Sequence, residues 1–368
     1  MTAGADELDA RILRAIGDYA LGDAAFLALA RDLFAYQIAH NAPYAAFARA
    51  AGFDAAHIPE RLDEIPAVPA AAFKETRLAT FPPDETAAAF ETSGTTRGRG
   101  GRHELPTTRL YDAALLASFD RMLLPDRARL RYLNLVPDPR ENPHSSLGFM
   151  MATVARERGD GAGGWYLHRE DLDVDGFVRD AARASADGVA VCVATTAFAL
   201  VALLDALAAR GARLALPAGS RIMETGGFKG RSRVVERAEL YAGASDRLGI
   251  GVEAIVAEYG MTELSSQYYD SFASRSRIEP RVKIAPPWLR PVVVDGDGRA
   301  LPSGVVGAIR HLDLANRGSV IAIETEDLGA LVASLGSGQA GLVLLGREQG
   351  AELRGCSLDA ETLLARRG

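Results

Sequence analysis

Between about Glu91 and Gly260, short apolar runs alternate with longer helical runs, and this alternation restricts the chain to few folds. Parallel strands need such long connections, because each strand must return to the same edge of the sheet. The predicted strands are Leu130–Val136, Gly188–Ala194, Arg213–Leu216, Arg221–Glu224 and Val252–Ala257. The predicted helices are Tyr111–Leu124, Val174–Ala186, Ala197–Arg210 and Ser232–Leu248. The sequence therefore predicts an α/β core of mostly parallel strands flanked by helices.

The sequence on either side of this core does not alternate strands with helices. The first fifty residues show helical periodicity and lead into a proline-punctuated connector, so we expect a helical segment over 1–85 that packs on the core at 86–270. Residues 271–350 predict a small β-rich subdomain, followed by a tail over 351–368 that ends in a short helix. The β-like runs of that subdomain are Pro291–Asp295, Gly307–Leu312, Ser319–Glu324 and Gly341–Leu345.

Composition excludes several classes of function. The chain of 368 residues has a net charge of −7, which argues against nucleic acid as its main partner. Its two cysteines, Cys192 and Cys356, lie far apart and form no metal or redox motif, as in a reducing cytoplasm. No basic, apolar leader is visible, and the most apolar stretch, Val189–Leu207, divides into a strand and a helix carrying Asp205. We expect a cytoplasmic protein without a membrane span.

A loop rich in hydroxyl groups and glycine is the strongest local signal. It consists of Thr92, Ser93, Gly94, Thr95 and Thr96, and an arginine-rich run from Arg97 to Arg102 follows. Glycine lets backbone amides approach phosphate oxygens closely, and arginine adds charge-assisted donors. The loop has no Walker motif, and a polar surface loop of no function has a similar composition.

A second signal follows the predicted strand Val252–Ala257. It reads Glu258, Tyr259, Gly260, Met261, Thr262 and Glu263. Ligands of parallel α/β sheets collect beyond the carboxyl ends of the strands. A threonine hydroxyl and a carboxylate at this edge suit a phosphate and its Mg²⁺, which prefers oxygen ligands. A plain turn at glycine, with Glu263 opening a helix, is the alternative.

Two weaker signals also lie at the ends of β-like runs. Gly226, Gly227 and Phe228 offer a flat backbone and an aromatic ring against which a base can lie. Asp327, before Leu328 and Gly329, offers a carboxylate for the two hydroxyls of a ribose. Taken alone, either segment is better explained as a plain turn.

The order of these segments, with Gly346 and Arg347 after them, resembles the adenylate-forming superfamily of acyl-CoA synthetases, peptide-synthetase adenylation domains and firefly luciferase. The resemblance spans residues 60 to 358. It implies that Thr92–Thr96 bind the phosphates of ATP and that Gly226–Phe228 line the adenine. It further implies that Thr262 binds phosphate, that Glu263 binds Mg²⁺ and that Asp327 binds the ribose. Arg347 would mark the hinge toward a lid domain.

Within the superfamily, the chain is most similar to the acyl-protein synthetases of the LuxE family. That family uses a cysteine near the C-terminus to accept the acyl group as a thioester, and Cys356 matches its position. An incidental cysteine is the alternative. His144 stands where the superfamily often has an aromatic residue or a histidine beside the reacting carboxylate, although a lone histidine is more often structural. Cys192 lies in an apolar run and is interpreted as core.

The sequence departs from the superfamily at two places. Arg97 replaces a common glycine, and so few residues follow Arg347 that the usual lid with its catalytic lysine is expected to be absent. The resemblance leaves open what replaces that lysine, and Lys74 is interpreted as an ordinary surface residue.

The predicted function is ATP-dependent activation of a carboxylic acid, with a fatty acid as the substrate that the family implies. The acyl group then passes to Cys356 and on to a partner, which by resemblance is a reductase subunit. Two alternatives stay open: ligation of an acid to coenzyme A, a carrier-protein thiol or an amine, and a nucleotide-binding subunit without catalysis.

Overall fold

The computed structural model describes residues 4–92, 100–169, 171–226, 235–270, 281–332 and 341–347. The chain divides into two compact units, each described by itself below. The first unit takes residues 1–117, 261–268 and 278–368, and the second takes residues 118–260 and 269–277. The sequence predicts four consecutive segments, at 1–85, 86–270, 271–350 and 351–368. Each compact unit contains residues from more than one of these segments, and their boundaries remain a prediction.

The second unit is built on five parallel strands in the order β10-β9-β8-β4-β5. These strands are β4 (Leu130–Leu135), β5 (Gly159–Trp165), β8 (Val191–Thr196), β9 (Arg221–Thr225) and β10 (Ile255–Tyr259). A short hairpin, β6 (Leu167–His168) with β7 (Asp171–Leu172), follows β5. Strands β4, β8 and β9 are buried on both faces and carry short apolar runs, which explains why their positions were predictable.

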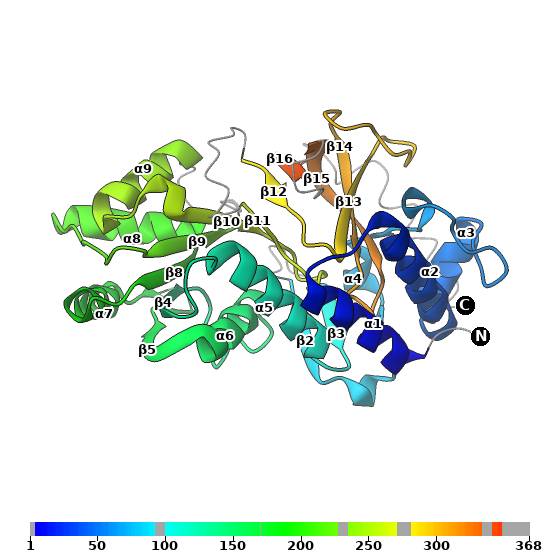
Figure 1. The fold of residues 1–368 in the computed structure, drawn as a ribbon, viewed down its shortest axis with the longest axis horizontal. Coiled ribbons are helices and arrows are strands. Elements are labelled where there is room, and N and C mark those ends of the chain that lie inside the picture. The colour runs from blue at the N-terminus through cyan, green and yellow to red at the C-terminus, as the bar shows by residue number, and fades with distance from the viewer. Residues whose placement is uncertain are drawn as a thin grey trace. The chain divides into compact units, whose positions relative to one another are not determined.

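Helices cover both sides of this sheet. Figure 1 shows α8 (Ala197–Ala209) and α9 (Arg237–Leu248) on one side of the strands and α6 (Ser146–Arg158) on the other. With α7 (Val174–Asp187), helices α8 and α9 share a core with apolar residues of β4, β8, β9 and β10. Side-chain caps start three of these helices, because a hydroxyl or carboxylate satisfies an amide of the first turn. The capping residues are Ser145, Asp173 and Thr196.

One predicted strand is wrong. Residues 212–217 contain no strand, because the amides of Leu214 and Leu216 donate to the carbonyls of Arg247 and Leu248 at the end of α9, at 2.7 and 3.1 Å. Helix ends leave carbonyls without helical partners, and this segment satisfies two of them. Helix α6 and the glycine-rich strand β5 were not predicted, since neither has a clear apolar period.

The first unit carries an antiparallel sheet in the order β13-β14-β15-β16-β12, with β1 running parallel to β15. Its strands are β1 (Val68–Pro69), β12 (Lys283–Ile284), β13 (Leu289–Val294), β14 (Gly307–Asp313), β15 (Ala322–Val332) and β16 (Gly341–Arg347). The predicted β-rich C-terminal part is therefore confirmed, as is the α/β class. Strand β11 (Tyr268–Tyr269) contains the boundary between the units.

The N-terminal helices belong to the same unit as these strands. Helices α1 (Ala5–Asp18), α2 (Asp23–His40) and α3 (Ala42–Ala50) share one apolar core with β14, β15 and the chain between them (Figure 1). Polar contacts hold α1 and α2 against the segment between β14 and β15. Gln37 accepts from the amide of Ile321 at 2.8 Å, and Arg317 donates to the buried carboxylate of Asp9 at 2.7 Å. The ends of the chain sequence thus build one body.

Candidate functional site

The ends of the predicted phosphate loop are held together by the hairpin of β2 (Ala88–Glu91) and β3 (Arg102–Leu105). The Thr92 amide donates to the carbonyl of Gly101 at 2.9 Å, and the Gly101 amide donates to Thr92 Oγ1 at 2.7 Å. A Cβ on Gly100 would lie 2.6 Å from the Thr92 carbonyl oxygen, so only glycine fits there. Ser93, Gly94, Thr95 and Thr96 lie outside the described residues.

His103, which sequence reasoning missed, ties this hairpin to Thr262. Its ring lies fully buried on β3, and Nδ1 is 2.9 Å from the Thr262 carbonyl oxygen. A carbonyl only accepts, so the proton sits on Nδ1. Burial lowers the pKa of His103 to about 4, which keeps the ring neutral at physiological pH. Two of the predicted segments, around Thr92 and Thr262, are therefore joined inside the first unit.

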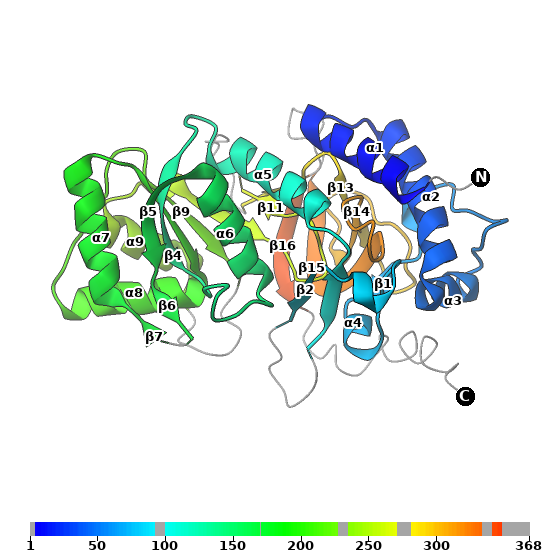
Figure 2. The same cartoon turned by 90° about the horizontal axis from the view of Figure 1, so that it is seen from below.

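Figure 2 places α4 (Ala72–Glu75) beside β1 and β2 in the same unit. Phe73 of this short helix meets the His103 ring edge-on, with the ring centroids 5.9 Å apart. The aromatic contact packs against the imidazole and supports its orientation. The proline-punctuated connector predicted from the sequence thus ends next to the loop and the Thr262 turn.

The turn that carries Glu263 is fixed by a buried polar network. Asn316 donates to the Glu263 carbonyl at 2.9 Å. Asp313 accepts from the Ser265 amide at 3.0 Å and from the Ser266 hydroxyl at 2.8 Å, and burial raises the pKa of Asp313 to about 6. Glu263 itself is 5% exposed. Its carboxylate is therefore carried by a turn whose backbone has little freedom.

The second unit presents carboxylates at the ends of its parallel strands. Glu258, the fourth residue of β10, accepts a hydrogen bond from the hydroxyl of Thr225 at the end of β9. On β9, Glu224 accepts from the Tyr241 hydroxyl at 3.0 Å. Gly226 follows with a positive φ of 77°, a backbone conformation that glycine adopts at little cost. Gly227 and Phe228 lie outside the described residues.

The motif at 258–263 crosses from one unit to the other. Tyr259 ends β10, Gly260 is the last residue of its stretch in the second unit, and Met261 packs against the core of the first unit. His144 is exposed in the second unit, just before Ser145, which caps α6. A role for His144 beside a reacting carboxylate stays a prediction.

Asp327 and Arg347 are paired across the sheet of the first unit. Their backbones face each other on β15 and β16, and the Asp327 amide is held by Thr325 Oγ1 at 3.2 Å. Asp327 is half-buried, and its role in binding a ribose stays a prediction. Cys356 lies outside the described residues, so its role as acyl acceptor stays a prediction.

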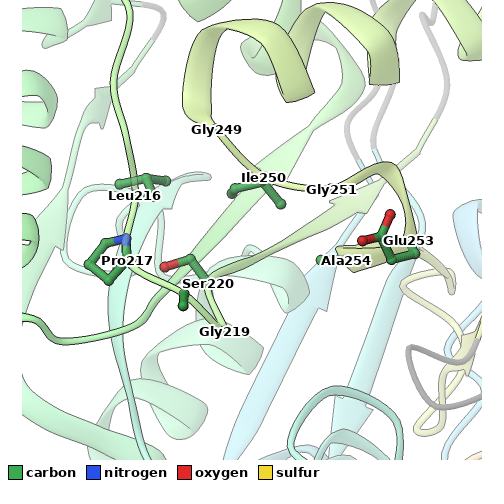
Figure 3. A pocket seen from close by; sticks show the side chains of 10 residues that line it. Leu216, Pro217, Gly219, Ser220, Gly249, Ile250, Gly251, Glu253 and Ala254 are labelled. Atoms are coloured by element: carbon green, nitrogen blue, oxygen red, sulfur yellow. The ribbon is translucent and has the colours of Figure 1, made fainter.

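A hollow of about 440 Å³ lies elsewhere in the second unit (Figure 3). It is lined by residues that precede β9 and β10, among them Pro217, Ser220, Ile250 and Glu253. This is the amino end of the parallel strands, whereas ligands of such sheets bind beyond the carboxyl ends. We therefore do not assign the nucleotide to it.

No helix within the described part of the chain is long and apolar enough to cross a membrane. The same residues contain no group of three or more His, Cys, Asp or Glu side chains arranged to hold a metal. Mg²⁺ bound together with a nucleotide needs only one or two protein carboxylates, because phosphates and water complete its coordination.

Solved structures with the same fold are adenylate-forming ligases. A 2-hydroxyisobutyryl-CoA ligase in complex with 2-HIB-AMP and CoA matches with a TM-score of 0.65 at 16% identity, over 94% of this chain and 69% of that one. Amide bond synthetase McbA from Marinactinospora thermotolerans matches with a TM-score of 0.50 at 20% identity, over 72% and 49%. ATP-bound MatB from Rhodopseudomonas palustris matches with a TM-score of 0.50 at 19% identity, over 73% and 49%.

The chain spans about half the length of McbA and MatB. At these identities the likeness shows a shared fold. A search of curated proteins finds no match. The sequence profile described as "Acyl-protein synthetase, LuxE" matches residues 23–364, which is nearly the whole chain. The protein therefore belongs to the LuxE family of acyl-protein synthetases.

Proposed function

We propose that the protein activates a carboxylic acid with ATP and then transfers the acyl group to a thiol. Membership of the LuxE family supports this reaction. The observation that carries the proposal is the hydrogen bond between His103 and Thr262, which holds the base of the Ser/Thr/Gly loop and the Thr262–Glu263 turn in one rigid body. A loop and a turn held in this way can orient a triphosphate without losing further conformational entropy during the reaction.

In the first step, a carboxylate oxygen attacks the α-phosphorus of ATP. A new bond forms between that oxygen and phosphorus, the bond to the β-phosphate oxygen breaks, and pyrophosphate leaves. Thr92 and the following loop residues would hold the phosphates, and Thr262 would donate to the α-phosphate. Asp327 would accept from the ribose hydroxyls, and the Gly226 segment would line the adenine.

Glu263 fits as the protein ligand of Mg²⁺. It is a single oxygen ligand on a fixed turn, which suits an ion that also binds substrate phosphates and water. The bound ion would supply positive charge against the phosphate oxygens. The chain's own contribution is to position the carboxylate, through Asn316 and the Asp313 network.

In the second step, a thiolate attacks the acyl carbon of the adenylate and AMP leaves with its phosphate. Cys356 is the proposed acceptor, because it matches the family position. Cys192 is unsuited, since it is fully buried on β8 and burial raises the pKa of its thiol to about 12. A fatty acid is the proposed substrate, a reductase subunit is the proposed next acceptor, and the cytoplasm is the proposed location.

Release of pyrophosphate from ATP and Mg²⁺, measured against a panel of fatty and aromatic acids, tests the first step. We expect acid-dependent release by the native chain, reduced on the order of 100-fold or more in Glu263→Gln because the neutral amide binds Mg²⁺ poorly. Glu60→Gln, at an exposed carboxylate, is the matched control and should behave as the native chain. Silence of the native chain with every acid would favour a non-catalytic nucleotide-binding subunit.

Acyl labelling of the protein tests the second step. With radiolabelled acid and ATP, Cys356→Ser should release pyrophosphate normally but lose the hydroxylamine-sensitive label, because an acyl thioester can no longer form. Cys192→Ala should keep the label. Unchanged labelling of Cys356→Ser would refute the thioester, and acyl-CoA formed in solution without protein label would select the coenzyme A ligase alternative.

A further inference from the structure

Among the residues that the structure describes, three cationic side chains lie near the base of the Ser/Thr/Gly loop, and carboxylates already neutralise two of them. Arg77 donates to the Glu104 carboxylate at 2.5 Å and to the Phe81 carbonyl at 2.6 Å. Arg102 donates to the other oxygen of Glu104 at 2.9 Å and to Glu91 at 3.3 Å. Each of these charges therefore faces carboxylates of the protein, so neither provides an uncompensated charge for a bound anion.

Lys74 is the third cation, and it is differently placed. It is exposed on α4, and within the described part of the chain no carboxylate pairs with its ammonium group. Glu75, the next residue along the helix, is also exposed and forms no ion pair with Lys74 within the described residues. Among the described residues, a positive charge is thus left without a carboxylate partner at the base of the proposed phosphate loop.

The stem of Lys74 lies against the base of the loop. A Cβ placed on Gly101 would be 3.5 Å from Lys74 Cγ, 3.3 Å from Phe73 Cβ and 3.4 Å from Thr92 Oγ1. The lysine stem and the Thr92 hydroxyl therefore border the same glycine. Phe73, which precedes Lys74, fixes this end of α4 through its contact with His103, so the ammonium is carried by an anchored backbone.

Lysine is also a rare choice in this chain. The sequence contains 41 lysine and arginine residues, of which Lys74, Lys229 and Lys283 alone are lysine. Lysine presents a compact charge with three rotatable donors on a flexible stem, whereas arginine presents a planar fork. A triphosphate whose oxygens shift as pyrophosphate leaves suits the compact and rotatable donor. Lys283 is 3% exposed and so is not available to a ligand in this way.

We infer that the Lys74 ammonium contacts the phosphates of ATP at the base of the loop, beside Thr92 and Gly101. The inference rests on the proposed function for the identity of the anion as ATP. It assigns a substrate-binding role to a residue that sequence reasoning treated as surface. It also supplies, from the N-terminal part of the chain, a lysine charge near the reacting phosphates.

Binding of ATP and of AMP, measured by calorimetry on the full chain, tests this role. Lys74→Met removes the charge and keeps the apolar stem against Gly101, so the fold should be unaffected in thermal unfolding. We expect ATP affinity to fall by about 10- to 100-fold, the size of one charge-assisted hydrogen bond, and AMP affinity to change far less. Lys74→Arg should retain part of the ATP affinity.

Arg109→Ala is the matched control, since Arg109 is an exposed cation at the start of α5 (Arg109–Leu123), away from the loop base. It should bind ATP as the native chain does. Unchanged ATP affinity in Lys74→Met, equal losses for ATP and AMP, or no ATP binding by the native chain would each overturn the inference. Pyrophosphate release with unchanged ATP affinity in Lys74→Met would leave the proposed function standing. Selective loss of ATP affinity in Lys74→Met, together with no pyrophosphate release by the native chain, would support the role of Lys74 and contradict the proposed function.

Discussion

At the scale of single residues, His103 shows how a polar side chain is retained in a core at a cost. Its Nδ1 donates to Thr262, while Nε2 is buried and has no hydrogen-bond partner within the described residues. An unsatisfied buried acceptor costs about 1–3 kcal/mol, and a leucine here would avoid that cost. The hydrogen bond from His103 fixes the position of the Thr262 carbonyl. We therefore interpret His103 as a positioning residue.

Replacing His103 tests that interpretation. His103→Leu removes the donor to Thr262, and we expect pyrophosphate release to fall by about tenfold in kcat, because the Thr262 hydroxyl is less well oriented toward the α-phosphate. His103→Asn places an amide donor near the position of Nδ1 and should recover a large part of the rate. Steady-state kinetics and thermal unfolding of both variants are the measurements.

A purely structural role for His103 gives a different pattern. In that case the leucine variant would have native kcat whatever its melting temperature, and the asparagine variant would offer no recovery. The roles inferred for Lys74 and His103 both depend on a neighbour from another segment of the chain, which is Gly101 for Lys74 and Thr262 for His103.

At the scale of elements, the end of β14 and the turn after Glu263 depend on one buried carboxylate. Asp313 accepts hydrogen bonds from Ser265, Ser266 and the amide of Ala315, and it is fully buried. Trp288 donates to the same Ser266 hydroxyl at 3.0 Å. Within the described residues, the Asp313 carboxylate accepts hydrogen bonds from neutral donors only, which explains why burial outweighs hydrogen bonding and its pKa is raised.

The raised pKa of Asp313 predicts a pH dependence of stability. An acid whose pKa rises on folding binds more protons in the native state, so its contribution to stability falls as pH increases from about 4 to about 6. A change in the pKa of Asp313 from its ordinary value of 3.8 to about 6 corresponds to roughly 3 kcal/mol. Urea unfolding of the native chain and of Asp313→Asn should show this change in their difference between pH 7 and pH 4.

In that experiment, the free energy of unfolding of the native chain minus that of Asp313→Asn should rise as the pH falls. Subtracting the variant removes the titration of all other groups, which the two proteins share. A difference that stays constant over this pH range would mean that Asp313 is charged in the native state at pH 4, contrary to its burial among neutral donors.

The segment at 213–216 marks the limit of local pattern at this scale. Its alternation of Leu214 and Leu216 is that of a strand, yet the carbonyls of Arg247 and Leu248 take its amides. A strand forms only where a neighbouring strand offers free amides and carbonyls. Here the carbonyls at the end of α9 accept the hydrogen bonds of the segment instead. In contrast, β4, β8 and β9 matched their predicted positions, because each is buried on both faces and so is continuously apolar.

At the scale of the whole molecule, the sequence order and the compact units do not coincide. The first unit combines N-terminal helices with C-terminal strands, and the contacts that do so join residues far apart, such as Gln37 with Ile321. The motif at 258–263 continues from one unit into the other. The order of segments along the chain therefore does not reveal which of them build each compact unit.

The sequence by itself determined the α/β class, most strands of the parallel sheet and the kinship with adenylate-forming enzymes. These follow from apolar period and from the order of short motifs, both of which are local properties of the chain. Only the tertiary structure decided that His103 bonds to Thr262, 159 residues away, and that Lys74 borders Gly101. The physical reason is that such contacts depend on packing between distant segments, and no local pattern of residues encodes which distant group a buried side chain will meet.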